Sequence, residues 1–498
     1  MDLPMKIFTH SSNPNQFAWN TIIRGFSISL NPEKALHIFI KMLRKTFEPE
    51  SFTYAFVLKA CAKMNAFQTG KSVHVIVLKS GYGSHLFVAN TMIHLYASCA
   101  DLGSARKLFD ELYQPNAVTW NALISGYVQN GLADEGLRVF HLMRSEGIRP
   151  DDVTVIGVIL ACAQKKELEL GRWLHGYVDD NIAEFEMNLN VWTAFIDLYG
   201  KCGQMDVARQ VFNNLRRRDI GVWNALIGGY VSNGCYREAL DLFQDLEMDG
   251  FYPDETTLAS TLTACRHIGD LNVGKKIHKC IEEKCSTFNS ILGTAMVDMY
   301  SKCGCISEAR KVFNNTPKRD LMTWTSMICG LAVHGYAQDA LDIYEEMLGT
   351  GLRPDGVTFV GVLCACSHAG LIDQGLHYFQ SSMNTYKISP TAEHHGCIID
   401  LLSRSGRLSE AYEIIRSMKS QPNPIIWRAL LSACRVHSNV ELAEAAVANL
   451  FKLESDQSAD YILLSNIYAS NGRWEDVETI RRKMGEVVLR KVPGLSFV

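Results

Sequence analysis

The sequence predicts an all-α solenoid, in which helix-turn-helix hairpins stack in a row instead of folding around one globular core. The first observation is that five tryptophans recur at spacings of 101, 103, 101 and 103 residues. The second is that cysteines and histidines keep the same period, in phrases such as LACAQ and GRWLHG. A fixed long period marks an array of stacked units, so functional residues should also recur from unit to unit. The tryptophans are Trp19, Trp120, Trp223, Trp324 and Trp427.

The basic hairpin is clearest at residues 117–151. Its apolar residues follow helical spacing in two stretches, which are separated at Asn130 and Gly131 and ended by Gly147 and Pro150. A hairpin of this kind cannot bury its apolar face alone, so we expect neighbours to stack against one another. The same pattern fits 16–50, 220–254 and 321–355.

Two variant hairpins lie between successive copies of the basic one. A longer variant, which carries the Ala-Cys phrase, spans 51–85, 152–188, 255–289 and 356–391. A shorter variant spans 86–116, 189–219 and 290–320, and a related hairpin covers 392–423. We therefore predict a partial unit at 1–15, an array of about twelve hairpins at 16–423 and a distinct segment at 424–498.

Composition restricts the possible functions. The chain has 498 residues and a formal net charge of −4, which argues against gripping nucleic acid by bulk positive charge. It does not argue against recognition of exposed bases. Fifteen cysteines without disulfide-scaffold spacing favour a reducing compartment. The longest apolar run, 153–163, is too short to span a bilayer, so no membrane association is expected.

The repeated phrases resemble those of the plant pentatricopeptide repeat family, PLS class, in which P, longer L and shorter S motifs alternate. VTWNALISGY, LYGKCGQMDVARQVF and MYSKCGCISEARKVF carry the likeness. The segment 424–498 resembles the E-type extension of that class through IIWRALLSACRVHSNVELAE, YILLSNIYASNGRWEDVETIRRKM and PGLSFV. The resemblance implies a right-handed superhelix of TPR-like repeats that binds single-stranded RNA.

The sequence predicts that this chain is not an enzyme. Some members of the family carry a DYW domain, which resembles zinc cytidine deaminases with HxE and CxxC motifs. Neither motif occurs in this sequence. We also expect no room for such a domain after PGLSFV, no metal and no cofactor. The N-terminus has no clear sorting signal and is expected to begin in the middle of a unit.

The recurring cysteines and histidines are predicted to pack and not to bind metal. Cys364, Cys366 and His368 resemble a ligand group, but four converging ligands are missing. A lone cysteine beside alanine in each long hairpin is typical of a small packing position. The tryptophans are likewise predicted to anchor the core and not to stack on bases. The recurring residues are Cys61, Cys162, Cys265 and Cys366, with His74, His175, His278 and His377.

Better binding candidates are polar residues at two recurring positions of the P and S hairpins. The fifth residues are Asn20, Asn90, Asn121, Thr193, Asn224, Thr294 and Thr325. The last residues of the same hairpins are Glu50, Asn116, Asp151, Asp219, Asp254, Asp320 and Asp355. Helix capping would account for the last residue, but it explains less well why only Asn or Thr stands at the fifth position. In this architecture two or three side chains of each repeat recognise one base.

The resemblance implies a code in which Asn/Asp prefers U, Thr/Asp prefers G and Asn/Asn prefers a pyrimidine. Apolar fifth residues in the L hairpins, and Gly396 in the last hairpin, should discriminate weakly. The predicted target, from 5′ to 3′, is N-N-Y-U-N-G-U-N-G-G-N-N. The L residues are Ala55, Ile156, Ala259 and Val360. The second residues Phe17, Phe87, Val118 and Ile291 are expected to flank bases, a pattern from which Asn190 and Gly221 depart.

The leading hypothesis is a sequence-specific RNA-binding factor for C-to-U editing in a plant organelle, with a mitochondrion favoured over a chloroplast. The resemblance implies a monomer whose E-type extension recruits a DYW-type deaminase in trans, together with accessory editing factors. One alternative is a factor for organellar RNA stability, splicing or translation. A second alternative is a protein-interaction solenoid, because related helical repeats bind peptides.

Overall fold

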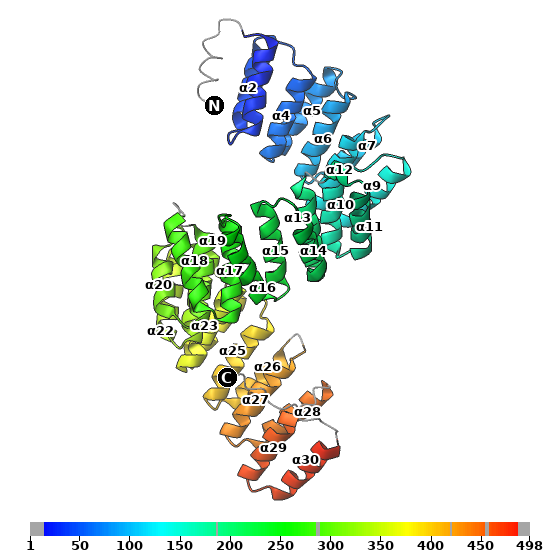
Figure 1. Ribbon diagram of the computed structural model, residues 1–498. Coiled ribbons are helices and arrows are strands. Elements are labelled where there is room, and N and C mark those ends of the chain that lie inside the picture. The colour runs from blue at the N-terminus through cyan, green and yellow to red at the C-terminus, as the bar shows by residue number, and fades with distance from the viewer. Residues whose placement is uncertain (1–13, 186–187, 285–288, 419–420, 454–457, 487–498) are drawn as a thin grey trace. The chain divides into compact units, whose positions relative to one another are not determined.

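The computed structural model describes residues 14–185, 188–284, 289–418, 421–453 and 458–486, and every regular element within these ranges is a helix (Figure 1). This result confirms the predicted all-α repeat solenoid. The chain divides into two compact units, Met1–Thr257 and Leu258–Val498. Each hairpin has a first helix and a second helix of equal or shorter length.

In the first unit, the first helices of successive hairpins pack side by side (Figure 1). They are α2 (Gln16–Ile28), α4 (Ser51–Lys63), α6 (Leu86–Ser98), α8 (Ala117–Gln129), α10 (Asp152–Lys165), α13 (Leu189–Lys201) and α15 (Ile220–Ser232). The second helices pack back on them and are α3 (Glu33–Arg44), α5 (Phe67–Lys79), α7 (Leu102–Asp110), α9 (Ala133–Ser145), α11 (Leu168–Asp180), α14 (Met205–Asn214) and α16 (Tyr236–Met248).

The second unit repeats this order. Its first helices are α17 (Glu255–Ile268), which begins at the end of the first unit, α19 (Ser290–Lys302), α21 (Leu321–Val333), α23 (Gly356–Ala369), α25 (Ala392–Arg404), α27 (Pro424–Val436) and α29 (Ser458–Ser470). Its second helices are α18 (Leu271–Lys284), α20 (Ile306–Asn315), α22 (Ala337–Gly349), α24 (Ile372–Asn384), α26 (Leu408–Ser417), α28 (Val440–Lys452) and α30 (Trp474–Glu486).

The Asn-Gly turns of two P hairpins, at Asn130 and Asn233, also contact the hairpin before them. Gly131 has a φ of 76°, a left-handed conformation that glycine adopts without a steric penalty. The Asn130 amide donates to the carbonyls of Gly126, at 2.7 Å, and of Ala97 on the preceding first helix, at 2.9 Å. A Cβ on Gly126 would lie 2.6 Å from the Cβ of Ala97, so the two first helices approach closely here. The NG phrase therefore sets both the turn and the spacing between units.

The tryptophans are core anchors, as predicted, and all five are buried. Trp120 meets Phe109 of the preceding second helix edge-on, with ring centroids 4.7 Å apart. The pairs Phe212–Trp223 and Phe313–Trp324 repeat this contact at 4.7 and 5.0 Å. These three tryptophans thus join an S hairpin to the P hairpin that follows it, which explains their regular recurrence.

The recurring cysteines and three of the four recurring histidines pack as predicted, whereas the prediction is wrong for His377, which is exposed. Cys61, Cys162, Cys265 and Cys366 have no exposed surface. The ring Nδ1 atoms of His74, His175 and His278 lie 2.7 to 2.8 Å from the hydroxyls of Tyr96, Tyr199 and Tyr300 on the next first helix. Leu402 occupies the equivalent position after His377, so this contact cannot form there.

The structure adds one element that the helical pattern did not predict. A short helix, α12 (Ile182–Phe185), follows α11 in the long hairpin 152–188. Phe185 is buried, and its ring centroid lies 6.1 Å from that of Tyr177. The extra residues of this hairpin therefore cover the end of α11 instead of forming an open loop.

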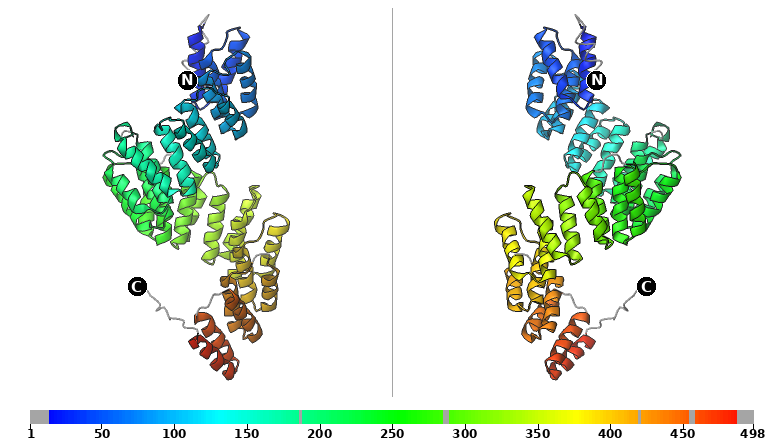
Figure 2. Two further views of the ribbon diagram at one scale, coloured as in Figure 1. Left: turned by 90° about the vertical axis from the view of Figure 1, so that its right-hand side faces the viewer. Right: turned by 90° about the vertical axis from the view of Figure 1, so that its left-hand side faces the viewer.

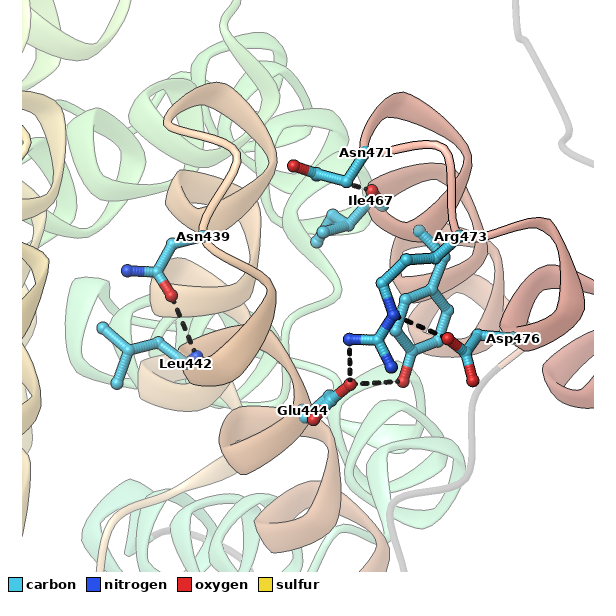
Figure 3. A network of polar contacts seen from close by, with 8 residues as sticks. Asn439, Leu442, Glu444, Ile467, Asn471, Arg473 and Asp476 are labelled. Carbon is cyan, nitrogen blue, oxygen red and sulfur yellow. Dashed lines mark hydrogen bonds and ion pairs between the residues drawn. The ribbon is translucent and has the colours of Figure 1, made fainter.

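The C-terminal hairpins continue the stack of the second unit, with the orange-to-red helices following the yellow ones in both views of Figure 2. Figure 3 shows how α28 is joined to the last hairpin. Glu444 accepts from the Tyr468 hydroxyl and from Arg473, each at 3.0 Å, and Arg473 also contacts Asp476 at 2.6 Å. The predicted partial unit at 1–15 and the PGLSFV end lie almost wholly outside the described residues.

Candidate nucleic-acid interface

The clearest site lies where one P hairpin meets the next first helix. The amide Nδ2 of Asn121, the fifth residue, donates to both carboxylate oxygens of Asp151, at 2.8 and 3.0 Å. Its Oδ1 accepts from the hydroxyl of Thr154, at 2.6 Å. Thr154 also contacts Asp151 Oδ1 at 2.8 Å. The two residues that the sequence singled out are therefore in direct contact, and a third residue joins them.

The same set recurs one cycle later. Asn224 Nδ2 donates to Asp254 at 2.9 Å, and the hydroxyl of Thr257 donates to Asn224 Oδ1 at 2.5 Å. Thr257 Oγ1 lies 3.0 Å from Asp254. We call the threonine at the third position of the following first helix the linking threonine. We call the last residue of each hairpin the loop residue.

In two hairpins with a threonine at the fifth position, the linking threonine makes the only described connection to the loop residue. The hydroxyl oxygens of Thr325 and Thr358 are 2.9 Å apart, and Thr358 donates to Asp355 at 2.8 Å. The hydroxyl oxygens of Thr294 and Thr323 are 2.7 Å apart, and Thr323 donates to Asp320 at 2.8 Å. The fifth and loop residues are thus joined indirectly.

Three other predicted pairs are not joined in this way. In the first hairpin Thr53 donates to Asn20 at 2.6 Å, while Glu50 is exposed.

In the hairpin 86–116, Asn90 Oδ1 is buried without a hydrogen-bond partner among the described residues, and Thr119 donates to Asn116 instead. In the hairpin 189–219, the linking position holds Val222, and Thr193 donates to the carbonyl of Leu189 at 2.8 Å.

The loop residues also cap helices. Asp151, Asp219, Asp320 and Asp355 each accept from the backbone N–H three residues later, at 2.8 to 3.0 Å. Capping therefore accounts for an aspartate at the loop position, as the plainer interpretation held. Capping does not account for the fifth residues, because they lie inside the first helices and cap no helix.

Burial differs sharply between the fifth and second residues of the first helices. Asn121 is 6% exposed and Thr325 is 3% exposed, so each presents only an edge to solvent. In nine of the first helices, though not in those with Asn190 or Gly221 at this position, the second residues are large and apolar, yet between 42% and 77% of their surface is exposed. They are Phe17, Phe52, Phe87, Val118, Val153, Ile291, Met322, Val357 and Ile425. A repeated apolar side chain that the core does not use indicates a binding surface.

Positive charge on the first helices is largely engaged within the chain. Lys63 donates to the carbonyls of Ile28 and Ser29 at 2.9 and 2.6 Å. Lys201 pairs with Asp197 at 2.7 Å. This surface is therefore suited to contacts with individual groups of a ligand, and less to binding through bulk charge.

Family models match the hairpins. The PPR repeat family model matches 14–63, 115–164, 218–267 and 319–368, and the PPR repeat model matches 87–114, 191–220, 294–320 and 394–421. An E motif matches 437–498, inside the predicted extension. The chain is 40% identical to a chloroplastic pentatricopeptide repeat-containing protein of Arabidopsis thaliana, over 99% of this chain and 71% of the relative. The chain belongs to the pentatricopeptide repeat family.

Other relatives agree with this assignment. A mitochondrial pentatricopeptide repeat-containing protein of Arabidopsis thaliana is 38% identical, over 100% of this chain and 78% of its own length. Among solved structures, the chain is similar to the maize pentatricopeptide repeat protein PPR10 in complex with an 18-nt psaJ RNA element. That match has a TM-score of 0.60 at 15% identity, and covers 98% of this chain and 81% of PPR10. It supports the fold.

The pattern of fifth residues in this pentatricopeptide repeat protein changes at the C-terminal end of the array. Gly396 leaves the fifth position of α25 without a side chain. In α27 the fifth residue is Arg428, which forms a two-pronged ion pair with Asp460 at 2.9 and 3.0 Å. Asp460 stands at the linking position of α29 and has no exposed surface. An internal ion pair thus occupies the place where the array has Asn or Thr.

The part of the chain that the structure describes shows no group of three or more His, Cys, Asp or Glu residues able to hold a metal ion. No helix in these ranges is long and apolar enough to cross a membrane.

The linking threonines are the residues that sequence reasoning missed. Their signal was present, because a threonine recurs at the third position in phrases such as AVTW, DVTV, LMTW and GVTF. That position looked like part of the core pattern, since it directly precedes the tryptophan in the P hairpins. Its partner lies about one repeat earlier, so a single hairpin does not reveal its role.

Proposed function

We propose that this protein is a sequence-specific single-stranded RNA-binding factor for C-to-U editing in a plant organelle. The observation that carries the proposal is the recurring set of a fifth residue, a linking threonine and a loop aspartate, flanked by an exposed apolar second residue. Such sets occur in the hairpins of Asn121, Asn224, Thr294 and Thr325, at most one in each hairpin. This arrangement suits a ligand with a regular repeat, and an RNA strand with splayed bases has such a repeat.

The chemistry of each set suits a base edge. Asn121 keeps one amide hydrogen and one oxygen lone pair beyond its contacts with Asp151 and Thr154. This donor and acceptor complement the N3–H and carbonyl of uracil. The exposed apolar side chains of Val118 and Val153 can pack against the two faces of a base between them, a contact that does not depend on base identity.

The hairpins without such a set should leave gaps in the recognised sequence. Ala55, Ile156, Ala259 and Val360 offer no polar atom at the fifth position, and Gly396 offers no side chain. The proposed target therefore remains N-N-Y-U-N-G-U-N-G-G-N-N, numbered 1 to 12 from its 5′ end.

Editing itself would require a deaminase bound in trans. We propose that the C-terminal extension 424–498, which includes the E motif match and the Arg428–Asp460 ion pair, recruits a DYW-type deaminase protein and accessory factors. The protein itself would supply no catalytic residue. Relatives named chloroplastic and mitochondrial support an organelle as the site of action.

Binding can be tested with purified full-length protein and 12-nucleotide RNAs. The target RNA should bind at least tenfold more tightly than an RNA of the same composition with positions 4, 6, 7, 9 and 10 permuted, as two or three lost base contacts would give. Permuting only the unspecified positions is the matched control and should change little. Equal binding of all three RNAs would refute sequence-specific recognition.

The editing role can be tested in plants that lack the protein. Loss of C-to-U conversion at a site downstream of a matching sequence, with normal transcript abundance and splicing, would support editing. Altered abundance or splicing with all sites edited would instead support the alternative role in RNA stability or processing.

A further inference from the structure

We propose that the linking threonine sets base preference, because it decides whether the fifth residue of the preceding hairpin offers a hydrogen-bond donor or only an acceptor. This inference rests on the proposed RNA-binding function and assigns a specificity-determining role to a residue that does not itself face solvent. It concerns the hairpins with threonine at the fifth position most directly.

The linking threonines are buried more completely than their role in helix capping requires. Each has no exposed surface. They are Thr53, Thr119, Thr154, Thr257, Thr323 and Thr358. A hydroxyl enclosed in this way must satisfy its hydrogen bonds within the protein, so the direction of each bond can be worked out from its neighbours.

The Thr325 hairpin shows the consequence. Asp355 caps α23 as a carboxylate and can only accept, whereas the hydroxyl of Thr325 can itself donate, so the single proton of Thr358 goes to Asp355 at 2.8 Å. Thr358 Oγ1 then has no second proton, and its contact with Thr325 at 2.9 Å requires Thr325 to be the donor. The proton of Thr325 is thereby committed inside the protein. The oxygen of Thr325 faces a ligand as an acceptor only.

The Asn121 hairpin follows the same logic with a different result. Asp151 again can only accept, so the Nδ2 of Asn121 must face it and the Oδ1 must face Thr154. Thr154 has one hydroxyl proton and two neighbouring acceptors, Asn121 Oδ1 at 2.6 Å and Asp151 Oδ1 at 2.8 Å. It donates to the nearer one, Asn121 Oδ1, and this fixes the amide in one orientation. Because an amide has two hydrogens and two lone pairs, Asn121 still offers one donor and one acceptor.

An acceptor-only threonine distinguishes the two purines at N1. Guanine carries a proton on N1 and can donate to Thr325, whereas adenine N1 is itself an acceptor and would face a lone pair. Without the linking threonine, the hydroxyl of Thr325 could rotate to suit either purine. With it, the proton of Thr325 is held inside the protein, and the remaining acceptor favours guanine. The Thr294 hairpin has the same geometry through Thr323.

One hairpin provides a natural exception. Val222, which is fully buried, stands at the linking position after Thr193, so Asp219 has no hydroxyl through which to orient that residue. Thr193 donates instead to the carbonyl of Leu189 in its own helix, at 2.8 Å. The Leu189 carbonyl also accepts a helix hydrogen bond, so it should bind the Thr193 hydroxyl proton more weakly than Thr358 binds that of Thr325. We expect weaker discrimination between G and A at position 6 than at positions 9 and 10.

The test measures binding of full-length protein to the target RNA with G or A at position 10. Thr358→Val removes the linking hydroxyl but keeps the shape of the side chain, and should lower the G-to-A affinity ratio about fivefold, as expected for one hydrogen bond. Thr358→Ser keeps the hydroxyl and should retain the wild-type ratio. The ratio at position 9 should be unchanged in both variants, which controls for folding.

The reverse variant is Val222→Thr, which should raise the G-to-A ratio at position 6 about threefold or more. It remains informative if Thr358→Val does not fold. The proposal is overturned if Thr358→Val keeps the wild-type ratio, if Thr358→Ser loses it equally, or if Val222→Thr leaves position 6 unchanged. Wild-type protein that binds the target specifically but ignores G and A at position 10 would also overturn it. Failure of the wild type to distinguish target from permuted RNA would instead refute the proposed function.

Discussion

Replacing Arg428 with alanine tests the ion pair that marks the end of the recognition pattern. Arg428 lies on α27 and Asp460 on α29, and the guanidinium contacts both carboxylate oxygens at 2.9 and 3.0 Å. The hydrogen bond to Asp460 raises the pKa of Arg428, so the guanidinium stays protonated. Arg428→Ala would leave a carboxylate with no exposed surface without its cation.

The expected cost follows from that burial. Breaking a buried ion pair by removing one partner typically costs about 3–5 kcal/mol, because the remaining charge stays out of water. The Arg428 side chain is 26% exposed, so water could reach part of the vacated space, and we expect the lower end, about 3 kcal/mol. This corresponds to a roughly 150-fold increase in the population of the locally unfolded hairpins.

Hydrogen exchange followed by mass spectrometry can locate this effect. Peptides from α27 and α29 should exchange roughly 150-fold faster in Arg428→Ala, or at the unfolded rate if their protection is smaller than that. Peptides from α13 and α15 should not change, because repeats contact only their neighbours. Lowering the pH should reduce the defect, since an unpaired buried carboxylate binds a proton more tightly in the folded than in the unfolded chain.

The matched control is Arg404→Ala, which breaks the pair between Arg404 and Asp400 on α25. Both side chains are exposed, at 60% and 38%, so the expected loss is at most about 0.5 kcal/mol. If Arg428→Ala behaved like this control, the ion pair between Arg428 and Asp460 would not stabilise the two hairpins that it joins. The account of how the recognition pattern ends would then be wrong.

Four further predictions concern the core, the binding surface, the buried histidines and a buried cysteine. Trp223→Ala should destabilise its hairpins by about 4 kcal/mol in urea unfolding, because the ring is buried. Phe17→Ala should leave the melting temperature unchanged, since Phe17 is 77% exposed, but should weaken binding to the target RNA about tenfold. Burial lowers the pKa of His74 and His175 below the ordinary 6.5, so these rings bind protons more weakly when folded; stability in thermal melts should fall as pH drops from 7.5 to 5.5. Burial raises the pKa of Cys162 to about 12, so iodoacetamide at pH 8 should label it only after denaturation, and labelling of the native chain at that residue would contradict the packing role.

The sequence predicts the hairpins well because their signals are local and repeated. Apolar residues at helical spacing, NG turns and a tryptophan in each P hairpin all act within one hairpin or against its nearest neighbour. The burial of Trp120 against Phe109 needs only the order of the hairpins. Repetition averages out the departures of single units, so fold class and unit boundaries follow directly from the period.

The candidate site was only partly predictable. The fifth and loop residues stand out because they are polar and recurrent, but their contacts depend on how adjacent hairpins dock. Thr154 and Asn121 are 33 residues apart and meet only across that junction. The same holds for Arg428 and Asp460, which also meet only across such a junction. Here an arginine stands at the fifth position and an aspartate at the linking position of the next first helix, in place of Asn or Thr and a threonine. Single-hairpin patterns carry no information on such pairs.

The central claim is that the fifth residues recognise individual bases. The most direct measurement compares wild-type protein with the double variant Asn121→Thr, Asn224→Thr on RNAs that carry U or G at positions 4 and 7. The wild type should prefer U at both positions, and the variant should prefer G, with affinity for the rest of the target retained. A variant that still prefers U, or that binds both RNAs as the wild type does, would contradict the claim.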